Sequence, residues 1–286
     1  MMGSVTTCEI AKELDSETYV DVDRVRELCR NGVPSEIRGQ VWKYLLGVEL
    51  ADRSSEASLE RAGEEEYAAI EKHNSEYSRK IQKDTARYLQ RKPHQALSKE
   101  SAPVFEAVIN AYLNRNGGAS YSPGLVSLCA PLVVTFKRES DIFFCFERIM
   151  NLLNDYTLDH PVHTRVAEFL TLFRRTLPDL FNYFQEEEVD MNEWPSSWLL
   201  FLLSRELPLD NTIRLWDYYF THSSMVRFHT FVCLAILKLY QPNLEDLEQS
   251  EIRTVLCRLP GIDIDKALAT ATSIEHQVLN QERLDL

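Results

Sequence analysis

Apolar residues recur at intervals of three to four positions along most of this chain, and the strict alternation of half-buried strands is scarce. One clear case ends at Gly47, where Ile37, Val41 and Leu45 are spaced four apart. Segments with a comparable period lie at residues 21–28, 104–113, 140–153, 166–177, 198–205, 211–220, 228–240, 247–259 and 263–279. The pattern predicts an all-α protein of about a dozen or more helices.

Polar segments and turn residues separate these predicted helices. Residues 31–34 (NGVP) form a predicted turn, after which Ser35 is expected to cap the next helix. Residues 52–66 are rich in Ser, Glu and Arg, so we expect an exposed or mobile link there. One basic helix is expected to follow over residues 67–90, and the loop at 158–161 is the expected boundary between two lobes.

The composition is that of a soluble globular protein, since 44% of its 286 residues are hydrophobic and 26% are charged. Trp42, Trp198 and Trp216 lie on or beside apolar helices and are predicted to be core residues. A net charge of −13 argues against a nucleic-acid partner and against broad adhesion to anionic membranes. Because no stretch approaches the roughly 18 apolar residues of a membrane span and no signal-peptide pattern is present, we expect a cytoplasmic protein.

The cysteines and histidines show no pattern of a disulfide framework or a metal site. The six cysteines have no C-x-x-C spacing, and most lie within apolar runs, as Cys129 and Cys145 do. They are predicted to be small buried side chains. His160 and His163 share a loop, but no Cys, Asp or Glu pair completes a set of ligands there. We therefore expect no bound metal ion.

The most informative local feature is a basic stretch around Ile81, Asp84 and Arg87. These residues are spaced by three, so on a helix they fall within about a third of the circumference. Five further basic residues surround them: Arg79, Lys80, Lys83, Arg91 and Lys92. One interpretation is a solvated helix with an i,i+3 ion pair between Asp84 and Arg87. The other is an arginine that must reach a polyphosphate, which would explain a basic helix on an acidic protein.

Four short motifs occur in order along the chain. They are residues 38–47 (RGQVWKYLLG), 81–87 (IQKDTAR), 121–125 (YSPGL) and, later, Trp198 with 205–209 (RELPL) and 214–217 (RLWD). The order and the separations together resemble the TBC-domain family, the GTPase-activating proteins of Rab-type small GTPases. The resemblance extends from Val33 to Tyr240, which is most of the chain.

The resemblance implies a role for each matching residue. Arg38 and Trp42 match the family's R-x-x-x-W motif, whose role is chiefly to hold the active-site helices together. Ile81, Asp84 and Arg87 match I-x-x-D-x-x-R, whose arginine enters the GTPase as a finger. Asp84 would then position the finger through an interaction that the sequence does not specify.

A third family motif, Y-x-Q-G, is only partly retained. Tyr121 and Gly124 match it, but Pro123 occupies the position of the glutamine that orients the attacking water in the family. Proline has neither a side-chain amide nor a backbone N–H. Two alternatives follow: Arg87 acts while the bound GTPase uses its own glutamine, or the site has decayed and the domain only binds a partner.

The resemblance implies an all-α, multi-helix, two-lobed TBC domain. We expect an N-terminal helical extension at 1–30, a front lobe with the finger at 31–158 and a back lobe at 159–286. The expected activity is activation of a Rab-family GTPase in its GTP form, as an enzyme regulator without a substrate of its own. No cofactor is expected, because GTP and Mg²⁺ belong to the partner. The expected setting is vesicle trafficking, with recruitment to endomembranes only through the partner, and the alternative function is a catalytically weak or inactive adaptor.

Overall fold

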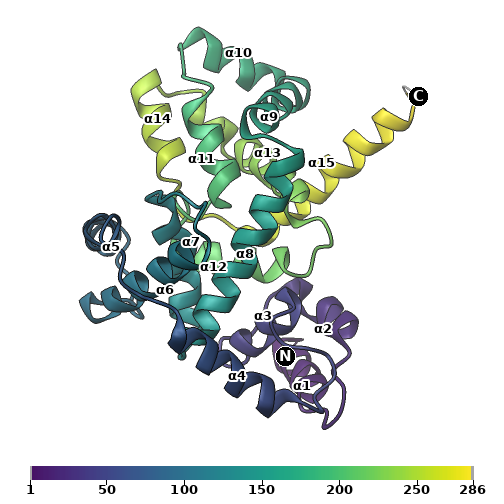
Figure 1. Ribbon diagram of the computed structural model, residues 1–286. Coiled ribbons are helices and arrows are strands. Elements are labelled where there is room, and N and C mark those ends of the chain that lie inside the picture. Colours follow the sequence, from purple (N-terminus) through teal and green to yellow (C-terminus); the bar gives the residue numbers. More distant parts are fainter. Residues whose placement is uncertain (1, 285–286) are drawn as a thin grey trace. The chain divides into compact units, whose positions relative to one another are not determined.

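The computed structural model describes residues 2–284 as a helical protein (Figure 1). These residues form fifteen α-helices and two short 3-10 helices, with no β-strand and one isolated bridge between Tyr19 and Asp52. The predicted all-α fold is confirmed. None of the helices in this range combines the length and the apolar character that a membrane span requires.

The chain divides into two compact units. The first contains α1 (Met2–Leu14), α2 (Val22–Leu28), η1 (Cys29–Asn31), α3 (Arg38–Leu46), α4 (Glu56–Ala69), α5 (Ser78–Arg91), η2 (Lys99–Ser101), α6 (Ala102–Arg115) and α7 (Gly124–Thr135). The second contains α9 (Val162–Thr176), α10 (Pro178–Glu186), α11 (Glu193–Phe201), α13 (Met225–Leu244), α14 (Gln249–Cys257) and α15 (Ile264–Leu284).

Two helices contribute to both units. The first unit ends at Leu152, within α8 (Glu139–Asp159). It also includes Trp216–Thr221, which begin inside α12 (Leu209–Tyr219). The boundary between the two units therefore lies within α8. The division into lobes at 31–158 and 159–286 stays a prediction.

The first unit is built around a cluster of aromatic rings. Trp42 on α3 and Trp216 on α12 are fully buried, with ring centroids 6.2 Å apart, and Phe220 packs edge-on against Trp42 at 5.0 Å. In the second unit Trp198 is also buried, and its indole N–H donates to the carbonyl of Leu256. The prediction that these three tryptophans are core residues is confirmed.

The segment predicted as an exposed or mobile link is mostly a helix, because α4 covers Glu56–Ala69. Its Glu, Ala and Arg residues are good helix formers. Only Tyr67 of α4 is buried, and its ring lies 5.2 Å from that of Phe143. The segment is largely exposed, as predicted, but it is a helix and not a link. A helix with one buried residue has almost no apolar period by which the sequence could reveal it.

The basic helix predicted over residues 67–90 is in fact two helices, α4 and α5, with a turn between them. In the turn, Lys72 Nζ donates to the carbonyl of Tyr67 at 2.8 Å. Helix α4 ends shortly after Tyr67, at Ala69. The side-chain oxygen of Asn74 accepts from the N–H of Tyr77 at 3.1 Å, just before α5 begins. Asn turns of this kind compete with the helical backbone, so the prediction of one continuous helix was wrong.

The prediction for the start of α3 was wrong, and the prediction for its end is confirmed. The helix begins at Arg38 after Ile37, without a side-chain cap, so the prediction that Ser35 caps it was wrong. The Ser35 hydroxyl donates instead to the carboxylate of Glu36 at 2.9 Å. Gly47 ends α3 with φ of 72°, a left-handed conformation that glycine adopts without a steric penalty, and this predicted end is confirmed.

Most cysteines are buried, as predicted. Cys29, Cys129, Cys145 and Cys233 are buried, whereas Cys8 and Cys257 are exposed. Burial, together with the nearby charge of Asp217, raises the pKa of Cys29 to about 12, so this thiol stays protonated and inert. Within residues 2–284 no group of three or more His, Cys, Asp or Glu side chains could hold a metal ion.

Candidate functional site

Helix α5 turns one face to the core and the other to solvent. Ile81, Thr85 and Tyr88 are buried at i, i+4 and i+7, and Tyr88 packs against Phe105 of α6 with ring centroids 6.3 Å apart. The exposed residues of α5 include five basic ones: Arg79, Lys80, Lys83, Arg87 and Arg91. Ile81 is thus a packing residue that fixes the orientation of α5, and this orientation turns Arg87 outward.

The side chain of Arg87 is accessible and yet held in place. It is 53% exposed, and its Nη1 donates to Oδ1 of Asp84 at 3.0 Å. Asp84 lies one turn earlier and is only 15% exposed. The i,i+3 ion pair expected from the spacing is therefore present. A guanidinium that is half exposed on a basic helix face can approach an anionic group of a partner.

The interaction of Asp84 that the sequence left unspecified is a hydrogen bond from Tyr121. The Tyr121 hydroxyl donates to Oδ2 of Asp84 at 2.9 Å, and its ring lies 5.9 Å from that of Tyr77. Burial, and then the bond to Asp84, raise the pKa of Tyr121, so the hydroxyl remains a proton donor at neutral pH. Asp84 therefore links Arg87 of α5 to the segment that precedes α7.

Pro123 occupies the N-cap of α7 and is exposed. Its φ of −56° and ψ of −22° are helical, and it provides no side-chain cap. Gly124 is buried as the first residue of α7, and its N–H donates to the hydroxyl oxygen of Ser122 at 3.3 Å. Where a glutamine would present an amide to solvent, the chain thus presents a hydrocarbon ring.

Arg38 and Trp42 meet at one buried carboxylate, that of Asp217 on α12. Arg38 Nε and Trp42 Nε1 donate to Oδ1 at 3.0 and 2.9 Å, and the N–H of Val33 donates to Oδ2 at 3.1 Å. Burial raises the pKa of Asp217, an effect that Arg38 and these hydrogen bonds oppose. The contact joins α3 to the part of α12 that belongs to the first unit. Its role is to hold these helices together.

Two residues of this arrangement carry no predicted role. Asp217 had a sequence signal, because a carboxylate beside Trp216 on an apolar helix requires partners when it is buried. Tyr77 had none, since its partner Tyr121 is remote in sequence and aromatic residues are common in cores. Trp198 and the motif at 205–209 belong to the second unit, whereas Arg87 belongs to the first.

Comparison with known proteins identifies the family. Residues 35–245, most of the chain, match the family model of the Rab-GTPase-TBC domain. The chain belongs to this family. TBC1 domain family member 22B of Homo sapiens is 27% identical to this TBC domain over 295 residues, covering 90% of the chain and 58% of the relative. TBC1 domain family member 14 of Mus musculus is 26% identical over 290 residues, covering 93% of the chain and 41% of the relative.

Solved structures share the fold of this TBC domain. The Ypt/Rab-GAP domain of Gyp1p matches with a TM-score of 0.79 at 21% identity, covering 95% of this chain and 97% of that one. A Chlamydomonas flagellar RabGAP TBC domain matches with a TM-score of 0.68 at 22% identity, covering 88% and 84%. At these identities the likeness shows the fold alone. The chain also spans only 58% and 41% of the lengths of the two curated relatives above.

Proposed function

We propose that this TBC domain stimulates GTP hydrolysis by a Rab-type small GTPase, with Arg87 as the arginine finger. The observation that supports the proposal most directly is the 53% exposed guanidinium, tethered by Asp84. The tether restricts the rotamers of a long side chain, so less conformational entropy is lost when the arginine enters a partner. Membership of the Rab-GTPase-TBC family supports the choice of partner.

The proposed chemistry is electrostatic. Negative charge lies on the oxygens of the transferring γ-phosphoryl group, and an arginine that donates to them there stabilises the transition state more than the bound substrate. An arginine finger accelerates hydrolysis about 10³- to 10⁵-fold. Asp84 and Tyr121 act as positioning residues for Arg87. The partner supplies GTP and Mg²⁺, so this chain needs no cofactor.

Because Pro123 replaces the family's glutamine, the partner itself has to orient the attacking water. Its exposed ring has no group that could orient the attacking water, so the bound GTPase uses its own glutamine. The domain recognises the GTP form, since only this form carries the γ-phosphate. Association with endomembranes during vesicle trafficking then comes through the GTPase.

Single-turnover hydrolysis across a panel of purified GTP-loaded Rab-type GTPases, with and without this domain, tests the proposal. For a GTPase that responds, Arg87→Ala should lower the stimulated rate by at least about 100-fold but weaken binding by less than about tenfold, because the arginine acts mainly in the transition state. Arg91→Ala is the matched control, since it removes the same charge from the exposed face of α5 one turn later. Stimulation by Arg87→Ala equal to that by Arg91→Ala would refute the finger.

A second pair of changes tests the role assigned to the partner's glutamine. Replacing that glutamine by leucine should abolish stimulation by this domain, because Pro123 has no amide that could substitute for it. Pro123→Gln should then restore part of the rate. If the unchanged domain fully stimulated the leucine variant of the GTPase, the partner's glutamine would not have the role proposed for it.

The second candidate function is that of a catalytically weak or inactive TBC module that binds a small GTPase, or another partner, as an adaptor. The observation that favours it is the exposed hydrocarbon ring of Pro123 at the N-cap of α7. A panel in which one GTPase binds tightly in its GTP form but none is stimulated would establish this function in place of the first.

A further inference from the structure

A cavity of about 480 Å³ lies within the first unit and shares no lining residue with the candidate site. Its walls are the end of α3, the segment after Gly47, one face of α4 and the first half of α8. Pockets that bind ligands have volumes of about 300–1,000 Å³, so this cavity is large enough to take part in recognition. The proposed function uses none of these residues.

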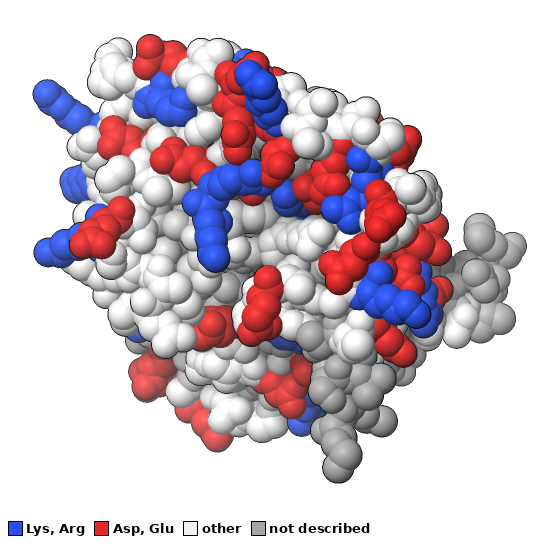
Figure 2. Space-filling view, turned by 90° about the horizontal axis from the view of Figure 1, so that it is seen from below, with Lys and Arg blue, Asp and Glu red and all other residues white. Residues whose placement is uncertain are grey.

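The cavity is acidic. Eight of its lining residues are Asp or Glu and two are cationic, Lys43 and Arg148. Three further arginines reach these carboxylates: Arg53, Arg115 and Arg138. Eight carboxylates thus face five cations, an excess of three negative charges. On the face seen from below in Figure 2, acidic side chains lie around an uncharged hollow, with Lys and Arg side chains between them.

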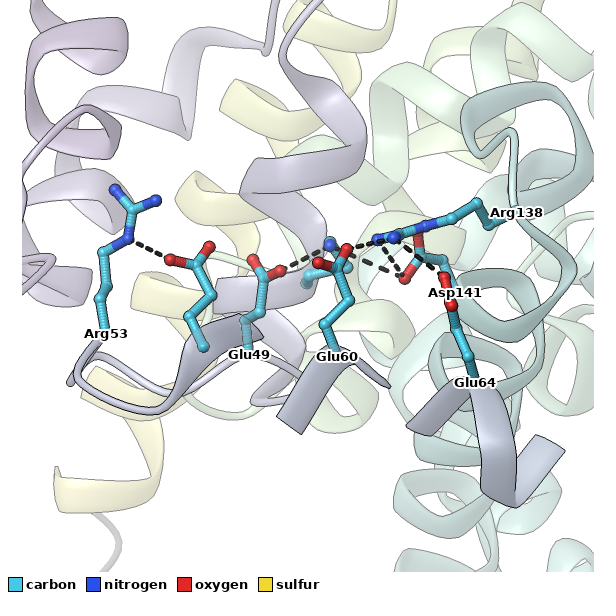
Figure 3. A network of polar contacts seen from close by, with 8 residues as sticks. Glu49, Arg53, Glu60, Glu64, Arg138 and Asp141 are labelled. Atoms are coloured by element: carbon cyan, nitrogen blue, oxygen red, sulfur yellow. Dashed lines mark hydrogen bonds and ion pairs between the residues drawn. The ribbon is translucent and has the colours of Figure 1, made fainter. Parts of the chain in front are cut away.

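The carboxylates that line the cavity outnumber the cations and share them. Arg138 is shared among Glu60, Glu64 and Asp141, and Lys43 is shared between Glu49 and Asp141 (Figure 3). One carboxylate oxygen of Glu49 is buried and has no hydrogen-bond partner among the described residues. Because the carboxylates outnumber the cations, a ligand that brings its own cations would be attracted to the exposed part of this network.

Two exposed apolar side chains line the same cavity, and a third belongs to a residue paired with a lining residue. Leu50 and Leu59 line the cavity and are 58% and 49% exposed. Tyr19, 60% exposed, pairs through its backbone with Asp52, another lining residue. These are three of the four large apolar side chains that are exposed within the described chain. Exposed apolar residues that cluster beside a cavity indicate an interaction surface.

We propose that this cavity docks a basic amphipathic segment of a partner protein, with Lys or Arg against the carboxylates and an apolar side chain against Leu50 and Leu59. The excess negative charge excludes an anionic occupant, and the apolar rim distinguishes the occupant from a simple cation. A second copy of this chain is a poor match, since the apolar residues of its basic helix, α5, face its own core. The proposal does not depend on the activity of Arg87.

Fluorescence anisotropy with a labelled helical peptide made of two Leu-Lys-Lys-Leu-Leu-Lys-Leu repeats tests this docking surface. We expect saturable binding that weakens as NaCl is added, because salt screens exposed charges. The double change Leu50→Ser and Leu59→Ser should weaken binding about tenfold, since both side chains would be covered by the peptide. Leu158→Ser is the matched control, because Leu158 is 81% exposed and does not line the cavity.

A second comparison isolates the charge. Glu64→Gln neutralises a lining carboxylate on α4 and should weaken binding about threefold, whereas Glu65→Gln, one position later and outside the cavity, should leave it unchanged. Thermal melting of each variant confirms its fold. Equal affinity across all variants would mean general attraction to an acidic protein and would overturn the proposal. Absence of binding, or loss of binding with Arg87→Ala, would overturn it as well.

Discussion

The buried contact between Arg38 and Asp217 permits a quantitative prediction. The side chain of Asp217 is fully buried, that of Arg38 is 20% exposed, and Arg38 Nε lies 3.0 Å from Asp217 Oδ1. Arg38→Met keeps the length of the side chain but removes its charge. The carboxylate then keeps only two neutral donors from the contact described above, Trp42 Nε1 and the N–H of Val33.

The expected loss of stability follows from this geometry. Removing one partner of a buried ion pair costs about 3–5 kcal/mol, because the other charge remains buried without compensation. Arg38 is one-fifth exposed, so water can replace part of the guanidinium, and we expect the lower end, about 3 kcal/mol. In a domain of about 150–250 residues, 1 kcal/mol shifts Tm by about 2–4 °C, so Arg38→Met should melt about 6–12 °C below the unmodified protein.

Urea denaturation and thermal melting at pH 7 measure the effect. Arg61→Met is the matched control, because Arg61 and its partner Glu65 are 81% and 68% exposed and their ion pair stabilises by less than about 1 kcal/mol. Adding Asp217→Asn to Arg38→Met should recover part of the loss, since no unpaired charge then remains buried and the amide oxygen can still accept a hydrogen bond. If Arg38→Met and Arg61→Met melted at the same temperature, the reasoning about this contact would be refuted.

Three further predictions concern the buried side chains of Trp216 and His229 and the hydrogen bond of Tyr121. Trp216→Ala should cost about 3–5 kcal/mol in urea denaturation because a fully buried indole is lost, and a melting point within a degree or two of the unmodified protein would contradict this. Burial lowers the pKa of His229 from 6.5 to about 3, so the stability present above pH 6.5 should fall toward pH 3, by about 2 kcal/mol at pH 5. His229→Phe should flatten this part of the profile, and an unchanged slope would exclude His229 as its cause. Tyr121→Phe should lower the stimulated hydrolysis rate about tenfold without changing GTPase binding, because a hydrogen bond to a charged group, worth about 1.5–3 kcal/mol, no longer holds Asp84. An unchanged rate would show that Tyr121 does not position the finger.

The sequence by itself determined the fold class and the local part of the site. Apolar periods of three to four residues predicted the helices, since a helix must bury a continuous stripe to be stable in a globular protein. The spacing of Asp84 and Arg87 predicted their ion pair, because residues three apart on a helix are neighbours. The resemblance to the family's Y-x-Q-G motif marked Pro123 as the position of a missing amide.

Prediction failed where the local signal was weak. α4 was missed because Tyr67 is its one buried residue, and an exposed helix of Glu, Ala and Arg has the composition of a polar link. The break before α5 depends on a hydrogen bond from Lys72 and one to Asn74. Side-chain hydrogen bonds of this kind compete with the backbone hydrogen bonds of a continuous helix. Small differences in local free energy decide such boundaries, and an apolar pattern does not record them.

Only the tertiary structure decided how the parts of the site are joined. Tyr121 reaches Asp84 across 37 positions of sequence, and Arg38 reaches Asp217 across 179. The sequence around each of these residues does not identify its partner, because a tyrosine hydroxyl or a carboxylate can form hydrogen bonds with many different groups. The pairing follows from the packing of several helices at once, and that packing is fixed by the sum of many weak apolar contacts distributed over the whole first unit.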